Sequence, residues 1–243
     1  MEPIVKLTRE VGTSAGVLLP RSWLNKEVVV TLKDLSDEDI AKGILGILLE
    51  KGLLSDVKGI YLVGSYARGD YSASSDVDVL VVTGKTNKLI ELRGYEIVLV
   101  SEENLSKNLP SDLYKLLAVR EARVIVNQEL IEKYRNVVPR LNVKKLKDEM
   151  RSVLKINNGA VESCKERVPD AIVYSLVLRL RELYSVRCLI KGILPNKNKF
   201  LREVGEKAYG AYLRVKRNGR EINDLSVEEA SKLLGKLEKW LKE

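Results

Sequence analysis

The pattern of apolar and polar positions divides the chain into three parts. Residues 1–33 show short runs with period-two alternation, separated by Gly and Pro, which is typical of short strands. Residues 36–135 alternate helices with continuous apolar runs, and from about residue 140 apolar positions recur at helical spacing. We therefore predict three domains at residues 1–35, 36–135 and 136–243: a β module, a mixed α/β domain and a helical bundle.

The middle part contains the clearest strand signals. Continuous apolar runs predict buried strands at Ile60–Val63 and Val77–Val82. The runs KLIEL and YEIVLV are joined by Arg93 and Gly94, which predicts a hairpin, and ARVIVN predicts a last short strand.

Helix starts are marked by capping residues, which are Ser36 with Asp39, Ser101 with Asn104, and Ser226 with Glu229. One long helix is expected to begin near Asp170, directly after Pro169, and to end before Pro195. The segment from Ser226 to Lys242 predicts a final amphipathic helix.

Composition excludes several classes of function. The chain has no histidine, and its two cysteines, Cys164 and Cys188, form no CxxC pair, so a zinc site, a disulfide framework and an imidazole base are not expected. No apolar run approaches the roughly 20 residues that span a bilayer, and the N-terminus lacks a signal-peptide pattern. We expect a cytoplasmic protein without a membrane partner. Abundant Lys and Glu beside a single Gln hint at a thermophilic source.

Charge is distributed unevenly along the chain. The net charge is +8, but residues 1–135 hold 18 basic and 20 acidic residues, and residues 136–243 hold 24 basic and 14 acidic residues. A basic second half indicates a polyanionic partner such as nucleic acid or nucleotide phosphates. A solvated helical surface of the thermophilic kind explains the same charges, and both interpretations stay open.

Two aspartates interrupt the second apolar run. Asp76 and Asp78 are one residue apart in the stretch YLVGSYARGDYSASSDVDVLVV at residues 61–82. Residues i and i+2 of a strand point to the same face, so we expect the two carboxylates to project side by side. Mg²⁺ prefers oxygen ligands and binds one or two carboxylates together with substrate phosphates. The pair therefore predicts a metal site for a nucleoside triphosphate.

A phosphate-binding turn is expected just upstream. Gly64 and Ser65 directly follow the predicted strand Ile60–Val63. A Gly-Ser pair at a strand-to-helix turn offers backbone N–H groups and a hydroxyl to phosphate oxygens. Arg68 lies about one helical turn further on and could reach the same phosphates.

These residues resemble the nucleotidyltransferase superfamily that includes DNA polymerase beta. The order Gly64-Ser65, ten residues, Asp76-x-Asp78 is most similar to the minimal and aminoglycoside (kanamycin-type) nucleotidyltransferases. The resemblance implies an α+β fold with a small mixed sheet flanked by helices. It also implies one or two Mg²⁺ ions, which hold a nucleoside triphosphate, expected to be ATP, and activate an acceptor hydroxyl.

The same resemblance implies a third carboxylate on a neighbouring strand, as a metal ligand or general base. Glu96 in GYEIVLV is the favoured position, and Glu91 in LIEL is the alternative. The family usually has Asp at this position. Glu is one methylene longer, so this departure from the family pattern affects whether a second metal ion binds.

The helical third part resembles the C-terminal bundle of kanamycin-type nucleotidyltransferases and the related HEPN bundles, over residues 170–204. In that family the bundle closes over nucleotide and acceptor. Basic residues become candidate phosphate or acceptor contacts, with Arg187 and Lys191 placed at the nucleotide; the full set is Arg179, Arg187, Lys191, Lys197 and Lys199. The HEPN nuclease motif needs a histidine, so nuclease activity is not expected.

The stretch VGTSAGVLLPRSWLNKEVVVTL resembles AbrB-type swapped-hairpin modules, with Thr13 where Asn is common. Such modules dimerise by interleaving strands and often bind DNA. A module of this length is too short to bury a core of its own. It must pack on the rest of the chain or on a second copy, so a homodimer is one expectation.

We therefore predict a Mg²⁺-dependent nucleotidyltransferase that moves a nucleoside monophosphate to an acceptor hydroxyl. The acceptor stays open between a small molecule, a protein and an RNA end. The alternative is a nucleotide-sensing or antitoxin-like regulatory protein, which binds DNA or a partner through its N-terminal strands.

Overall fold

The structure is a computed structural model of the 243-residue chain, and it describes residues 4, 6, 8–30, 35–71 and 75–243. The chain divides into two compact units, residues 1–43 and 44–243. Among the described residues, the helices are all too short or too polar to cross a membrane.

The first unit contains a small hairpin. Strands β1 (Arg9–Val11) and β2 (Ser14–Gly16) pair antiparallel in register Arg9 to Gly16. A 3-10 helix follows at Arg21–Trp23. Of the predicted strand GVLLP, only its first residue, Gly16, belongs to a strand. Residues 27–30 of the predicted strand EVVVTL form no strand, and the last two residues of that run lie outside the described part.

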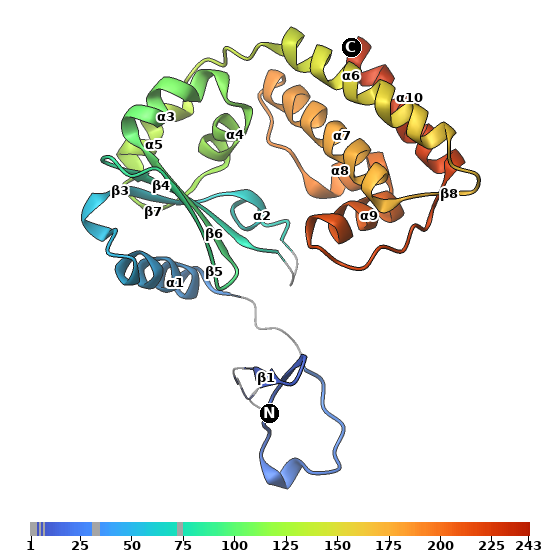
Figure 1. The fold of residues 1–243 in the computed structure, drawn as a ribbon. Helices are drawn as coiled ribbons and strands as arrows, with labels where there is room; N and C mark the ends of the chain where they lie inside the picture. Colours follow the sequence, from blue (N-terminus) through green and yellow to red (C-terminus); the bar gives the residue numbers. More distant parts are fainter. Residues whose placement is uncertain (1–3, 5, 7, 31–34, 72–74) are drawn as a thin grey trace. The chain divides into compact units, whose positions relative to one another are not determined.

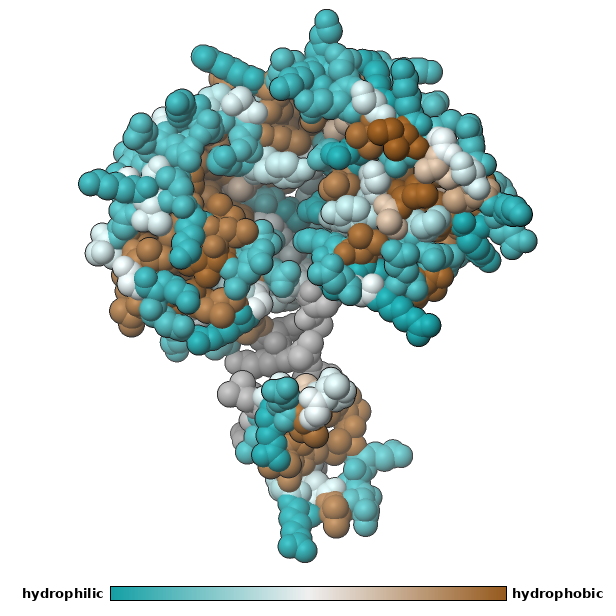
Figure 2. Space-filling view, viewed as in Figure 1, coloured by the Kyte–Doolittle hydropathy of each residue, from teal (hydrophilic) through white to brown (hydrophobic). Residues whose placement is uncertain are grey.

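Apolar side chains of this unit remain exposed. Leu24 is 72% exposed and Val29 is 92% exposed, and Figure 2 shows brown apolar side chains gathered on the surface of this unit. A segment of this length has too few side chains to enclose a core.

Helix α1 (Asp37–Glu50) begins in the same unit with the predicted reciprocal cap, in which Asp39 N–H donates to Ser36 Oγ at 3.1 Å and Ser36 N–H donates to Asp39 Oδ2 at 3.3 Å.

The second unit is built around a five-stranded mixed sheet of order β5-β6-β4-β3-β7 (Figure 1). Strands β4 and β6 run parallel and the other neighbours are antiparallel. The strands are β3 (Val57–Leu62), β4 (Val77–Thr83), β5 (Lys88–Leu92), β6 (Tyr95–Ser101) and β7 (Arg123–Val126). This agrees with the predicted α+β class and small mixed sheet.

The predicted hairpin joins β5 and β6. Arg93 and Gly94 both adopt left-handed conformations, with φ of 55° and 79°. Two consecutive residues of positive φ are the geometry of a two-residue turn that matches the twist of the strands. The turn fixes the register in which Glu91 pairs with Glu96.

Helices cover one face of the sheet (Figure 1). They are α3 (Glu102–Asn108), α4 (Leu113–Glu121) and α5 (Gln128–Arg135), and they follow the short helix α2 (Gly64–Arg68). One core joins this face to the helices and to the end of α7; its members include Leu80, Val82, Leu105, Leu116, Ile131, Val186 and Leu189. The sheet and the helical bundle are therefore packed together.

The bundle surrounds a central helix. Its helices are α6 (Val143–Glu162), α7 (Asp170–Ile190), α8 (Lys197–Val204), α9 (Glu206–Lys216) and α10 (Val227–Lys242). Helix α7 supplies fully buried residues such as Leu176 and Leu180, which belong to one core with Leu237 and Tyr212. The predicted helix at Asp170 and the capping box of Ser226 with Glu229 are confirmed.

A buried ion pair fixes the start of α7. The Asp170 side chain is fully buried and accepts from Arg214 Nε at 2.7 Å and Nη2 at 3.0 Å. Backbone N–H groups of Ile222 and Asn223 donate to the same carboxylate. This network joins α7, α9 and the short strand pair β8 (Arg167–Val168) and β9 (Leu225–Ser226) at one end of the bundle.

Candidate active site

The predicted strand-to-helix turn at Gly64 and Ser65 is present between β3 and α2. Gly64 begins α2 with φ of +69°, a left-handed conformation that glycine adopts without strain. A Cβ at this position would clash with the Asp78 carboxylate and approach its Cγ at 2.8 Å. Both the backbone angle and the contact therefore require glycine here. Helix α2 ends at Arg68, and Gly69 closes it with φ of 73°.

Asp78 lies beside this turn as the second residue of β4, and it is half-buried. Burial, followed by repulsion from Glu96, raises the pKa of Asp78 to about 6. Repulsion from Asp76 and Glu121 acts in the same direction, whereas Lys216 lowers the pKa. A bound cation would stabilise the ionised form of a carboxylate that is partly buried among other negative charges.

The sheet register places the other predicted carboxylates. Asp78 pairs with Glu96 across the parallel strands β4 and β6, and Glu96 in turn pairs with Glu91 on β5. Glu96 is therefore adjacent to Asp78, whereas Glu91 is one strand further away and exposed. Asp76 is exposed and directly precedes β4. Among the described residues, no three acidic, cysteine or histidine side chains are grouped to hold a metal by themselves.

Glu121, at the end of α4, is a site residue that sequence reasoning missed. Its Oε1 accepts the Gly64 N–H at 2.6 Å, and its Oε2 accepts from Arg68 Nη1 at 2.6 Å. Burial raises the pKa of Glu121, and the neighbouring Arg68 opposes that shift. The Gly64 N–H is therefore occupied by a carboxylate, and Glu121 holds the turn in place.

Arg68 and Asp70 link the turn to the bundle. Arg68 pairs with Asp70 at 3.3 Å as well as with Glu121, and all three side chains are less than one fifth exposed. Asp70 Oδ2 accepts the backbone N–H of Lys197 at 2.9 Å, where α8 begins. Asn196 caps the same helix. Through Arg68 and Asp70, the Gly64-Ser65 turn is thus connected to Lys197, which lies 127 residues beyond Asp70 in the chain.

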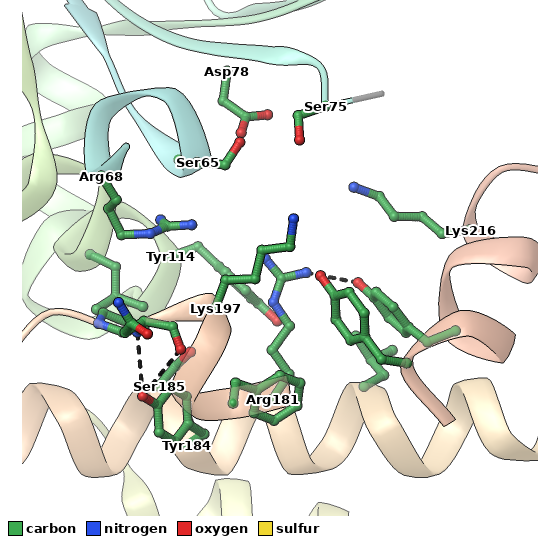
Figure 3. A pocket seen from close by; sticks show the side chains of 18 of the residues that line it. Ser65, Arg68, Ser75, Asp78, Tyr114, Arg181, Tyr184, Ser185, Lys197 and Lys216 are labelled. Atoms are coloured by element: carbon green, nitrogen blue, oxygen red, sulfur yellow. Dashed lines mark hydrogen bonds between the residues drawn. The ribbon is translucent and has the colours of Figure 1, made fainter. Parts of the chain in front are cut away.

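A pocket of about 360 Å³ opens between the turn and the bundle (Figure 3). The sheet side contributes Gly64, Ser65, Arg68, Ser75, Asp76 and Asp78. Helices α7 to α9 contribute the opposite wall, which includes Arg181, Lys197 and Lys216. In Figure 3 the amine ends of Lys197 and Lys216 point into the space next to Ser75, Ser65 and Asp78.

Aromatic side chains support this wall. The rings of Tyr209 and Tyr212 stack at 5.7 Å, and Tyr212 stacks on Tyr174 at 5.2 Å. Arg181 Nη1 donates to the Tyr212 hydroxyl at 2.7 Å. Tyr209 and Tyr212 line the pocket together with Tyr184. The wall therefore combines planar rings with positive charge.

The two other predicted nucleotide contacts lie elsewhere. Arg187 pairs with Glu243 at 2.7 Å, and its guanidinium lies 4.8 Å from the centre of the Trp240 ring. Lys191 follows the end of α7 and is exposed. Neither residue is among those that line the pocket, whereas Lys197, the candidate further along the chain, is.

One family model matches the part of the chain that contains the sheet. Residues 41–153 match the family model described as a nucleotidyltransferase domain. Comparison with curated proteins found no match. Among solved structures, a spectinomycin adenyltransferase from Enterococcus faecialis, solved with ATP and spectinomycin, aligns at 14% identity and a TM-score of 0.45, over 84% of this chain and 99% of that chain.

Proposed function

From the nucleotidyltransferase domain that residues 41–153 match, we propose that this chain transfers a nucleoside monophosphate from a nucleoside triphosphate to the hydroxyl of an acceptor, with Mg²⁺ as cofactor. One observation carries the proposal. The pocket brings the Gly64-Ser65 turn and Asp76 and Asp78 opposite a wall of positive side chains.

Asp76 and Asp78 are the proposed metal ligands, with Glu96 completing the set. The raised pKa of Asp78 supports this, since crowded carboxylates favour a bound cation. In the part of the chain that the structure describes, no three acidic, cysteine or histidine side chains are grouped around one point, and Mg²⁺ suits such a site because this ion keeps water and phosphate oxygens among its ligands. Bound Mg²⁺ would neutralise phosphate charge and favour the attacking hydroxyl.

The chain's own groups would orient the triphosphate, for which we propose ATP. Ser65 lines the pocket and would offer its hydroxyl to the phosphates, whereas the Gly64 N–H is held by Glu121. Lys197 and Lys216 extend toward the same space and would bind phosphate oxygens (Figure 3). Arg68 positions the turn through its two ion pairs.

Glu96 is the proposed general base. It is half-buried and pairs with Asp78 in the sheet, so its carboxylate lies beside the proposed metal ligands. The chain holds no histidine that could take this role. A carboxylate in this place accepts the proton of the acceptor hydroxyl as its oxygen bonds to the α-phosphorus and the bond from that phosphorus to pyrophosphate, the leaving group, breaks.

Calorimetry with a non-hydrolysable ATP analogue, with and without Mg²⁺, tests the proposal on the wild type and on the double variant Asp76→Ala/Asp78→Ala. We expect Mg²⁺-dependent binding that the double variant loses. Glu103→Ala, which removes an exposed carboxylate on α3, is the control and should bind as the wild type does. Equal binding by wild type and double variant would sink the assignment.

A second candidate function is regulation through the N-terminal unit. The exposed Leu24 and Val29 on residues 1–43 favour a partner, which is DNA, another protein or a second copy of the chain. A gel shift on mixed DNA without nucleotide, repeated at rising salt, tests the first of these. Tight, sequence-selective binding together with absent nucleotide binding would make this function the leading one.

A further inference from the structure

Every described carboxylate in the pocket already has a partner or a proposed metal. Glu121 accepts from Gly64 and Arg68. Glu182 accepts from Arg179 Nη1 at 2.7 Å and from the Tyr114 hydroxyl at 3.0 Å. The remaining two are Asp76 and Asp78. An acceptor with several ammonium groups would therefore meet no available carboxylate on this lining.

The opposite wall is positively charged. We call Arg181, Lys197 and Lys216 the cationic wall, since all three line the pocket from the bundle side. The hydroxyl of Tyr212, which Arg181 contacts, is neutral and leaves the guanidinium charge uncompensated by that bond. Arg217, the next residue after α9, also lines the pocket.

The donor nucleotide accounts for only part of this charge. A nucleoside triphosphate with one Mg²⁺ carries a net charge of about −2, and a second Mg²⁺ would neutralise Asp76 and Asp78. Lys197 and Lys216 point toward that side of the pocket and balance the nucleotide (Figure 3). Among the residues that line the pocket, the charge of Arg181 is then left over, and this residue lies on α7, on the bundle side.

Positive charge continues outside the pocket. Lys191 lies in the loop before α8, Lys199 lies in the first turn of α8, and Arg217 and Arg220 lie in the loop after α9; all four are exposed. The start of α8 contributes Lys197 to the pocket lining, and the loop after α9 contributes Arg217. A field of one sign at the mouth of a pocket raises the local concentration of oppositely charged ligands.

We propose that the acceptor is itself phosphorylated, and that Arg181 binds one of its phosphate groups. A guanidinium binds phosphate through paired hydrogen bonds. The same chemistry is offered by the end of a nucleic acid strand and by a phosphorylated sugar. This inference rests on the proposed nucleotidyl transfer.

Binding to the protein loaded with Mg²⁺ and the non-hydrolysable ATP analogue tests the proposal by calorimetry. The probes are a short single-stranded RNA with a free 3′ hydroxyl, glucose 6-phosphate, glucose, and kanamycin as a polycationic aminosugar. The variants are Arg181→Met, which removes the charge but keeps an aliphatic chain, and Arg202→Met as control, since Arg202 is an exposed arginine on α8 outside the pocket lining.

We expect at least one phosphate-bearing probe to bind, with glucose and kanamycin excluded. Arg181→Met should lower the affinity for that probe by about tenfold or more, because a hydrogen-bonded ion pair is lost. The affinity of Arg181→Met for the ATP analogue should stay within about twofold of the wild-type value. Arg202→Met should bind all probes with wild-type affinity. Binding of RNA alone identifies a nucleic acid end as the source of the phosphate, and binding of glucose 6-phosphate identifies a small metabolite.

Four outcomes overturn the inference. Binding of kanamycin without either phosphate-bearing probe contradicts the charge argument, as does the failure of both phosphate-bearing probes on a protein that binds the analogue. An equal loss of analogue affinity in Arg181→Met would assign this residue to the donor nucleotide. If the wild type does not bind the analogue at all, the proposed function fails, and the inference fails with it.

Discussion

Gly64 lies against the carboxylate of Asp78, and no Cβ fits between them. The contact joins the turn after β3 to the second residue of β4. It places the proposed phosphate-binding turn and the proposed metal ligand within van der Waals distance, so a change at either residue displaces the other.

We expect Gly64→Ala to abolish Mg²⁺-dependent nucleotide binding. The new methyl group would push the Asp78 carboxylate aside, and the positive φ would cost about 1–2 kcal/mol of folding free energy. Gly69→Ala is the matched control, because Gly69 also has positive φ (73°) but has no described atom within 4 Å of its added Cβ. Both variants should lose the stability that the positive φ costs, Gly64→Ala should lose more because of its clash with Asp78, and only Gly64→Ala should lose calorimetric binding.

Asp78→Asn should stabilise the fold in metal-free buffer above pH 6. The pKa of Asp78 is about 6 in the folded protein against a usual 3.8, so the folded state holds the proton more tightly than the unfolded state. The resulting penalty is fully present above pH 6 and vanishes below about pH 4. We expect a gain of about 1–3 kcal/mol at pH 8.

Urea denaturation with a chelator at pH 8 and at pH 4 measures this difference. The variant should also lose Mg²⁺-dependent nucleotide binding. A variant less stable than the wild type at pH 8 would contradict the burial of this charge.

Asp70→Ala should raise the KM for the nucleotide and destabilise the fold by about 1–3 kcal/mol, since it leaves the Lys197 N–H and Arg68 without their shared partner. Asp70→Asn should recover part of both effects, because its amide oxygen can still accept the Lys197 N–H. Steady-state kinetics and denaturation measure the two effects. Asp148→Ala removes an exposed i,i+3 pair with Arg151 and is expected to change stability by less than about 0.5 kcal/mol.

Arg214→Met should destabilise the fold by about 3–5 kcal/mol, because it leaves the fully buried Asp170 without its counter-ion. Hydrogen bonds from Arg214 hold the pKa of Asp170 below its usual value, so this pair stabilises the fold above about pH 4 and less as the pH falls below it. The variant should therefore lose stability mainly at neutral pH. Lys232→Met, at an exposed i,i+4 pair with Glu228, is the control and should be nearly neutral.

Local patterns predicted those elements whose cause is local. The box of Ser226 and Glu229, the hairpin at Arg93 and Gly94, and the long helix from Asp170 each depend on residues within a few positions of one another. The spacing from Gly64-Ser65 to the two aspartates also carried the family resemblance, which the domain match at residues 41–153 confirms.

Local sequence patterns do not predict contacts between segments that are distant in the chain. Glu121 reaches Gly64 across 57 residues, and Asp70 reaches Lys197 across 127 residues. Glu121 lies at the end of a helix with nothing in its neighbourhood to mark it. Its charge and its place in the bundle make Arg187 a candidate phosphate contact, but its helix turns it toward Trp240. The direction of a helical side chain depends on packing, which the charge pattern does not report.

The ribosome synthesises the two walls of the pocket at different times. A growing chain emerges N-terminus first, so the sheet with Ser65 and Asp78 leaves the ribosome long before the segment that carries Lys216. Until that segment is made, a nucleotide meets only one side of its binding site. Stabilisation by ligand is therefore available only to chains synthesised at least as far as α9, and an interrupted product gains no protection from the nucleotide pool.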